Sequence, residues 1–268
     1  MTAQTRTHIR GLLDRHGIVP RPSLGQNFLA DPNVIDRVVR TAEIQRGDRV
    51  LEVGPGTGAL TRALAATGAI VTAIEFDNRL EPVLVEELDS SGVTLLWADA
   101  MEVDYSHLLQ PTGWKAVANL PYQIGTPLLL DWLRFVPALI EFTLMVQLEV
   151  AQRLIAKAGN DAYGLPSVVV GLHAKAELAF KVPPQVFYPA PRVESAVVRM
   201  IRQPSPLLAE EAIRLAAGGF GQRRKMLRGA LSTVLERPIA SLEAAGIDPK
   251  LRAEDLSPED FLRLAEFA

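Results

Sequence analysis

The chain has 268 residues, 48% of them hydrophobic and 22% charged, a composition typical of a globular protein with a sizeable core. It contains no cysteine, which excludes disulfides, thiolate nucleophiles and cysteine-ligated metal centres. The net charge of −3 argues at first against a nucleic-acid partner, but residues 181–237 carry a local +6 and residues 1–46 a local +3, so two basic regions bracket an acidic body.

Strand and helix patterns alternate along the first part of the chain. A helix is predicted over 31–44, where Asp31 can cap the first turn and Pro32 suits the first helical position. Short apolar runs predict strands over 49–54, 69–77, 93–101, 115–120 and 141–148. Helical spacing predicts helices over 57–68, 78–88, from 126 onward, and over 149–159. This alternation predicts an α/β fold with a parallel sheet covered by helices on both faces.

The next segment departs from that alternation. Two β-rich runs, 167–182 and 193–202, leave no room for a helix between them. We therefore predict that they pair as antiparallel strands at the edge of an otherwise parallel, Rossmann-like sheet.

Only helical patterns follow the linker-like stretch 202–208, and the last of them covers 257–267. The chain is therefore predicted to hold a doubly wound domain over 1–203, including an N-terminal segment that covers a cofactor, and a small helical domain over 204–268.

A glycine-rich turn, "LEVGPGTGAL" (51–60), lies between the first predicted strand and its helix. Ligands bind at this edge of doubly wound sheets. Gly54 and Gly56 lack a Cβ and let the backbone approach a ligand closely. Glu75 ends the next strand, 21 positions after Gly54, and can accept two hydrogen bonds from ribose hydroxyls.

The glycine turn alone does not choose a cofactor. With Ala59 it also fits the Gly-x-Gly-x-x-Ala pattern, which leaves NAD open, as well as a purely structural turn. Glu52, just before the glycines, favours an ammonium or sulfonium group over a pyrophosphate. Asp99, at the end of the third strand, offers an acceptor for the exocyclic amine of an adenine. The combination favours S-adenosylmethionine.

The segment "NLPY" (119–122) follows the fourth predicted strand. Methylating an adenine amine requires hydrogen-bond acceptors, because the amine's lone pair is delocalised into the ring. The side-chain oxygen of Asn119 can accept one N–H, and a carbonyl of Leu120 or Pro121, aimed by the proline ring, can accept the other. Tyr122 offers a stacking face worth about 1–3 kcal/mol per base. The other interpretation is a strand-ending turn with an ordinary tyrosine.

Several segments in register resemble one known family. They are "SLGQNFL" (23–29), "EVGPGTGALT" (52–61), "DA" (99–100), "NLPY" (119–122), "VFYPAPRVESAVV" (186–198) and "FGQRRKMLRGAL" (220–231). Together they resemble the bacterial small-subunit ribosomal RNA adenine dimethyltransferases, whose loss gives kasugamycin resistance. The resemblance implies a class I S-adenosylmethionine-dependent methyltransferase. It also implies that two adjacent adenines in the 3′-terminal hairpin loop of 16S rRNA are dimethylated on a late pre-30S particle.

Site residues are carried over by motif. Cofactor contacts are implied at Asn27, Leu29, Gly54, Gly56, Glu75, Asp99 and Asn119. The target amine is implied to be held by Asn119, Leu120, Pro121 and Tyr122, with Phe187 packed on the flipped base opposite Tyr122. Phe187 could also be a core aromatic. The basic run Arg223, Arg224, Lys225 and Arg228 would follow RNA phosphates, or form a solvated helix face.

The chain departs from the family pattern at Leu148, where lysine is usual, and at Gly229, where asparagine is usual. A close alternative is the large-subunit adenine methyltransferases that confer macrolide resistance, although "LGQNFL" and "FGQRRK" favour the small-subunit enzyme. A second alternative is a non-catalytic RNA-binding factor, against which the intact Asn119, Tyr122 and Glu75 argue. We expect a cytoplasmic monomer with no membrane segment and no metal, because the four histidines lack a metal-ligand spacing.

Overall fold

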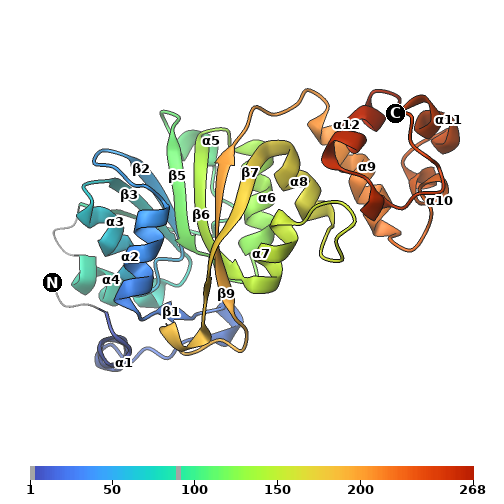
Figure 1. Ribbon diagram of the computed structural model, residues 1–268. Coiled ribbons are helices and arrows are strands. Elements are labelled where there is room, and N and C mark those ends of the chain that lie inside the picture. The colour runs from blue at the N-terminus through green and yellow to red at the C-terminus, as the bar shows by residue number, and fades with distance from the viewer. Residues whose placement is uncertain (1–3, 89–91) are drawn as a thin grey trace. The chain divides into compact units, whose positions relative to one another are not determined.

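The computed structural model describes residues 4–88 and 92–268, which fall into two compact units. The sheet unit comprises residues up to Ala151 together with Glu177–Ile201, and the helical unit comprises Gln152–Ala176 together with Arg202–Ala268 (Figure 1). Residues 152–176 thus group with the C-terminal helices, whereas the boundary expected between 203 and 204 assigned them to the sheet domain.

A seven-stranded sheet has the order β4-β3-β2-β5-β6-β9-β7. Its strands are β2 (Arg49–Val53), β3 (Ile70–Glu75), β4 (Thr94–Trp97), β5 (Trp114–Asn119), β6 (Leu139–Gln147), β7 (Ala174–Val182) and β9 (Ser195–Arg202). The strands from β4 to β6 run parallel, and β9 runs antiparallel to β6. This confirms the predicted mixed, mostly parallel sheet. Chain order reverses between β2 and β5, and such a switch point is where doubly wound sheets bind ligands.

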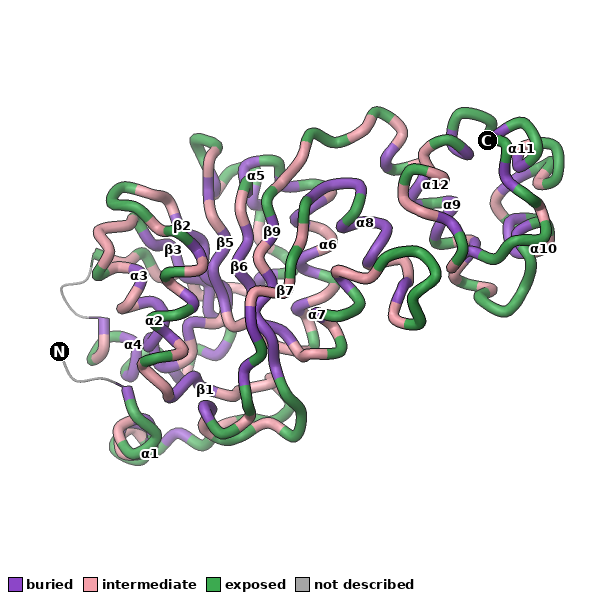
Figure 2. Tube along the Cα trace, viewed as in Figure 1, coloured by how far each residue is buried: buried purple, intermediate pink, exposed green. Residues whose placement is uncertain are grey.

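Helices α2 (Pro32–Thr41) and α3 (Ala59–Ala66) pack their apolar sides on the sheet. Buried Val38 and Leu64 of these helices share one core cluster with Val50 and Val117 of the strands. The other helices along this part of the chain are α4 (Glu81–Leu88), α5 (Tyr105–Leu108), α6 (Gly125–Phe135) and α7 (Leu148–Ile155). Figure 2 shows burial concentrated along the strands, as a sheet covered by helices requires.

Helix α1 (Arg6–Arg15) was not predicted from the sequence. The hydroxyl of Thr5 caps it by accepting the N–H of His8 (3.3 Å). Ile9, Leu12 and Leu13 are buried and join a second core cluster with residues of α4. Their spacing is helical, so the sequence carried a signal for this helix.

The strand predicted over 167–182 is wrong in its first half. Leu165–His173 form helix α8, and only residues from Ala174 onward form β7. Pro166 lies in the first turn, and the Ser167 hydroxyl accepts the N–H of Gly164 (3.1 Å). The valines at 168–170 are buried, and α8 contacts α9 (Ala209–Gly221) and α12 (Pro258–Ala265), so packing overrides their β propensity. β7 and β9 are neighbours in the sheet, as predicted.

After Arg202 the described residues form helices joined by turns and loops, and no strand, as predicted. In addition to α9 and α12 this part of the chain holds α10 (Leu227–Ala230) and α11 (Pro238–Ala244). Ser257 and Asp260 form a capping box at the start of α12, which falls within the helix predicted over 257–267. No helix in the described residues combines the length and the apolarity needed to cross a membrane.

Candidate active site

A pocket opens where β2, β3, β4 and β5 end, at the switch point of the sheet. The residues that follow these strand ends line it together with the segment 24–29. Among the predicted cofactor contacts, the lining includes Asn27, Leu29, Gly54, Gly56, Glu75, Asp99 and Asn119. The structure therefore brings together residues that lie far apart in the sequence, although no bound molecule tests their individual roles.

Both the backbone angles and the close packing of this turn require glycine at positions 54 and 56. Gly54 (φ 72°) and Gly56 (φ 59°) both adopt left-handed backbone conformations. A Cβ on Gly56 would lie 2.8 Å from Cδ1 of Phe28, and one on Gly54 would lie 3.4 Å from Cγ of Pro121. The turn therefore packs directly against Phe28, in the segment 24–29, and against Pro121, in the "NLPY" segment.

Glu75 fixes the glycine turn to the end of β3. Its Oε2 accepts the N–H of Gly56 (3.2 Å), and its Oε1 accepts the N–H of Asp77 (2.9 Å). Each oxygen keeps a second acceptor position, as binding a ribose diol requires. Burial raises the pKa of Glu75 and the charge of Asp77 adds to the shift, while backbone N–H groups, those of Asp77 and Gly56 foremost, partly oppose it. Asp99 accepts the N–H of Met101 (2.9 Å) and also borders the pocket.

Glu52 lines the same pocket although it is only 1% exposed. Burial raises its pKa to about 8, and the nearby charge of Glu75 adds to the shift. Its Oε2 has no hydrogen-bond partner among the described residues. An unpartnered carboxylate oxygen at a pocket wall favours a cationic ligand. Glu52 therefore suits the ammonium and sulfonium groups of S-adenosylmethionine.

Asn119 ends β5 with its side chain held in one orientation. Its Nδ2 donates to the carbonyl of Asn27 (3.1 Å), which leaves Oδ1 as an acceptor without a partner among the described residues. The Pro121 carbonyl already accepts the N–H groups of Ile124 (3.2 Å) and Gly125 (2.9 Å) at the start of α6. The Leu120 carbonyl takes no hydrogen bond from the described part of the chain, so of the two carbonyls left open by the sequence it is the one without a partner. Leu120 itself is buried and does not line the pocket.

Tyr122 is half-buried, and its ring is anchored by its hydroxyl. The phenol oxygen lies 2.7 Å from Oγ of Ser195, the buried first residue of β9. Burial raises the pKa of Tyr122, so the phenol stays neutral at physiological pH. Sequence analysis did not single out Ser195, although it lies within the quoted "VFYPAPRVESAVV" segment.

Phe187 lies in the hydrophobic core. It is 0% exposed, it shares a core cluster with Leu29 and Val197, and it does not line the pocket. This placement matches the core interpretation of Phe187. As placed, its ring offers no face to a base, and the stacking opposite Tyr122 stays a prediction.

Phe187 and Tyr188 form a short strand, β8, which pairs antiparallel with β1 (Phe28–Leu29). In this register Leu29 faces Phe187 and Phe28 faces Tyr188.

The basic run lies in the helical unit and not at the pocket. Arg223 is engaged, with Nε 2.9 Å from a carboxylate oxygen of Glu254 and Nη2 2.9 Å from the carbonyl of Asp161. Arg224, Lys225 and Arg228 are exposed. Within this run, Arg223 therefore makes contacts inside the protein, whereas the other three cations face solvent. Within residues 4–88 and 92–268, no three His, Cys, Asp or Glu side chains gather closely enough to hold a metal ion.

Comparisons with known proteins agree with this geometry. Two curated relatives named ribosomal RNA small subunit methyltransferase A are 47% identical (Magnetococcus marinus, 96% of this chain and 95% of the relative) and 44% identical (Brucella canis, 99% and 98%). A solved dimethyladenosine transferase from Plasmodium falciparum superposes with a TM-score of 0.77 at 26% identity, over 88% of this chain and 95% of the other.

The solved 23S rRNA methyltransferase ErmE superposes with a TM-score of 0.68 at 31% identity, over 90% of this chain and 99% of the other. The likeness to these two structures confirms the predicted class I methyltransferase fold. The model of the family described as ribosomal RNA adenine dimethylase matches residues 19–268, and the chain belongs to that family.

Proposed function

We propose that the chain dimethylates the N6 amines of two adjacent adenines in the 3′-terminal hairpin loop of 16S rRNA, on a late pre-30S particle. Membership of the ribosomal RNA adenine dimethylase family gives the reaction class, S-adenosylmethionine-dependent dimethylation of rRNA adenine. It also resolves the choice that the glycine turn left open between this cofactor and NAD. The observation that carries the proposal is a pair of unpartnered acceptors: Oδ1 of Asn119, which lines the pocket, and the carbonyl of Leu120, the next residue in the chain.

Each carboxylate that lines the pocket suits a different part of the cofactor. Glu75 would accept the ribose hydroxyls, Asp99 the adenine amine, and Glu52 would face the cationic end. When bound, S-adenosylmethionine supplies an electrophilic methyl group on a sulfonium. The covering segment 24–29, tied to Asn119 through Asn27, would exclude water from that methyl group.

The side chains and carbonyls of the site would orient the target amine relative to the methyl group of the cofactor. Asn119 Oδ1 and the Leu120 carbonyl would accept the two N–H bonds of the target amine, which directs its lone pair towards the methyl group. Tyr122, held by Ser195, would support the purine from one face. Neither acceptor is a base, and no Lys or His lines the pocket among the described residues. The methylated amine is acidic enough to lose its proton to water.

Relatives support the small subunit as the target. The curated relatives at 44% and 47% identity carry small-subunit names, whereas the 23S enzyme ErmE is 31% identical. Incubation of the chain with methyl donor and undermethylated pre-30S particles, followed by mass spectrometry of rRNA nucleosides, is expected to yield N6,N6-dimethyladenosine. Naked 23S rRNA should stay unmodified under the same conditions. Modification of 23S rRNA alone would establish the large-subunit activity, and no modification of either RNA would favour the non-catalytic factor.

The pH dependence of cofactor binding should report on Glu52. Because the pKa of Glu52 in the protein alone is about 8, Glu52 is mostly protonated at pH 6–7.5, and a cationic ligand must expel that proton. Affinity for S-adenosylmethionine should therefore rise by up to about tenfold per pH unit over this range and level off near pH 8. Isothermal titration should show a flatter profile for Glu52→Gln. Equal slopes for the two proteins would show that Glu52 does not ionise on binding.

We propose that Arg224, Lys225 and Arg228 bind RNA phosphates, because they are exposed cations on one short stretch of the helical unit. Their joint replacement by Gln should lower RNA affinity at low salt. It should also reduce the slope of log affinity against log salt by about two to three, since each released counterion contributes roughly 0.7–0.9. Lys175→Gln, an exposed lysine at the start of β7 in the same unit, is the control. An unchanged salt slope for the triple variant would show that these cations form a solvated face only.

A monomer acting in the cytoplasm is part of the proposal. One chain supplies every group that the proposed mechanism uses, including Asn119, Glu75 and Tyr122. The proposed substrate, the small ribosomal subunit, is cytoplasmic. Sedimentation of the active protein at the mass of a single chain is the expected result.

A further inference from the structure

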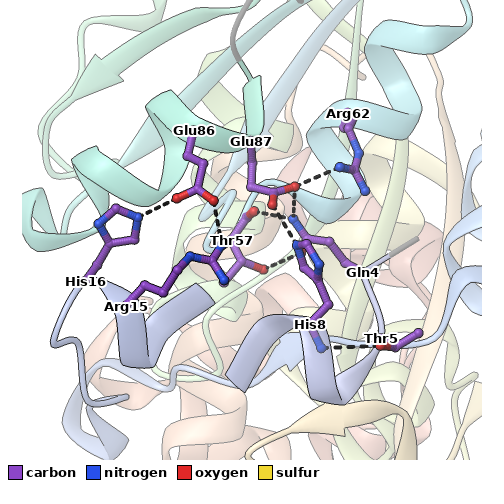
Figure 3. A network of polar contacts seen from close by, with 9 residues as sticks. All are labelled: Gln4, Thr5, His8, Arg15, His16, Thr57, Arg62, Glu86 and Glu87. Atoms are coloured by element: carbon purple, nitrogen blue, oxygen red, sulfur yellow. Dashed lines mark hydrogen bonds and ion pairs between the residues drawn. The ribbon is translucent and has the colours of Figure 1, made fainter. Parts of the chain in front are cut away.

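The N-terminal segment reaches the cofactor loop through one buried amide. Gln4 is only 1% exposed; its Nε2 donates to the carbonyl of Thr57 (2.7 Å), and its Oε1 accepts the hydroxyl of Thr57 (2.7 Å). Thr57 lies between Gly56 and Gly58 and lines the pocket. A single side chain therefore holds both a backbone and a side-chain group of the glycine turn (Figure 3).

Glu87 extends this contact to two further helices. Its Oε2 accepts from Gln4 Nε2 (2.9 Å) and from Arg62 Nη1 (2.7 Å), and its Oε1 lies 2.7 Å from Nε2 of His8. Arg62 lies on α3, the helix that leaves the glycine turn, and Glu87 lies on α4. With its side chain 6% exposed, Glu87 joins α1, α3 and α4 in one shielded network (Figure 3).

We propose that Gln4 is a positioning residue for the cofactor loop, holding Thr57 and the adjacent glycines in the conformation that binds S-adenosylmethionine. The inference rests on the proposed cofactor pocket. Three hydrogen bonds are lost together when the Gln4 amide is removed: those to the carbonyl and the hydroxyl of Thr57, and the one to Oε2 of Glu87, which keeps its bond from Arg62. The family match begins at residue 19, so Gln4 and the whole of α1 precede it.

The other end of α1 supplies a matched control. Arg15 and His16 both contact the carboxylate of Glu86 (2.5 and 2.7 Å), which joins α1 to α4 as the Glu87 contacts do. These side chains are partly exposed, and the dashed lines from Arg15 and His16 in Figure 3 lead only to Glu86 and not to the glycine turn. Loss of the Glu86 contacts tests the docking of α1, whereas loss of Gln4 tests the hold on the loop.

The test compares Gln4→Met, which keeps side-chain length but removes the amide, with the double variant Arg15→Gln, His16→Gln. Isothermal titration of the full chain with S-adenosylmethionine should show about tenfold weaker binding for Gln4→Met, the effect expected when one or two net hydrogen bonds are lost. In rRNA methylation the KM for the cofactor should rise while kcat at saturation stays at the wild-type value. Amide hydrogen exchange without cofactor should become faster at residues 56–58.

The double variant is expected to match the wild type in cofactor affinity and in exchange at the glycine turn. Equal affinity for Gln4→Met and wild type, or an equal loss in the double variant, would overturn the proposal. If Gln4→Met does not fold, Thr57→Val removes one hydrogen bond from the opposite side and should cause a smaller loss of the same kind. Failure of the wild type to bind S-adenosylmethionine would instead overturn the proposed function.

Discussion

Replacing Asn119 with alanine is expected to lower the rate of methyl transfer by about 10²–10³-fold, the range found when one aligned hydrogen-bonding group is removed from a reacting centre. The change deletes Oδ1, the acceptor proposed to hold the target amine. It also deletes the bond from Nδ2 to the Asn27 carbonyl, so cofactor affinity should fall modestly. Single-turnover transfer of a tritiated methyl group to pre-30S particles measures the rate directly.

Asn33→Ala is the control for Asn119→Ala, because Asn33 is an exposed asparagine on α2 in the same unit. Its rate should equal that of the wild type. An Asn119→Ala protein that transfers methyl groups as fast as the wild type would remove Asn119 from the reaction centre.

Replacing Glu75 with alanine is expected to weaken S-adenosylmethionine binding by about 10²–10⁴-fold. Hydrogen bonds to a charged carboxylate contribute roughly 1.5–3 kcal/mol each, and two such bonds to ribose hydroxyls would be lost. The glycine turn also loses its anchor, because the Gly56 N–H no longer has the Glu75 oxygen to donate to. Isothermal titration gives the dissociation constant for each protein.

Glu102→Ala removes the same charge from an exposed position and serves as the control for Glu75→Ala. Glu75→Gln should fall between the wild type and the alanine variant, since its amide keeps one acceptor oxygen. Unchanged binding by Glu75→Ala would place the ribose elsewhere in the pocket.

Much of the fold follows from local sequence patterns. Apolar runs of strand length between helical periods predicted five parallel strands, and the pocket at their ends follows from a rule on where such sheets bind ligands. The error over 167–173 arose because three consecutive valines indicate a strand when read locally. Their helical conformation is stabilised by contacts with α9 and α12, which follow much later in the chain.

Site residues divide in the same way. The placement of the glycine turn and Asn119 at the pocket could be predicted, because it follows from their positions at strand ends. The contacts that hold them could not, since Gln4 and Thr57 are 53 positions apart and Tyr122 and Ser195 are 73 apart. Phe187 differs from these residues. The motif implies a contact that it would make with a base in a complex, whereas its 0% exposure describes the protein without RNA.

The pairing of β1 with β8 connects the cofactor side of the site directly to the side proposed to hold the base. Leu29, at the pocket, and Phe187, proposed to meet the base, are partners in one ladder, and Arg6 of α1 donates to the Phe187 carbonyl (2.8 Å). Any shift of the segment 24–29 on cofactor entry would therefore act directly on the strand that carries Phe187. Thermodynamic linkage then requires reciprocity: whatever factor the cofactor imposes on RNA affinity, RNA imposes on cofactor affinity.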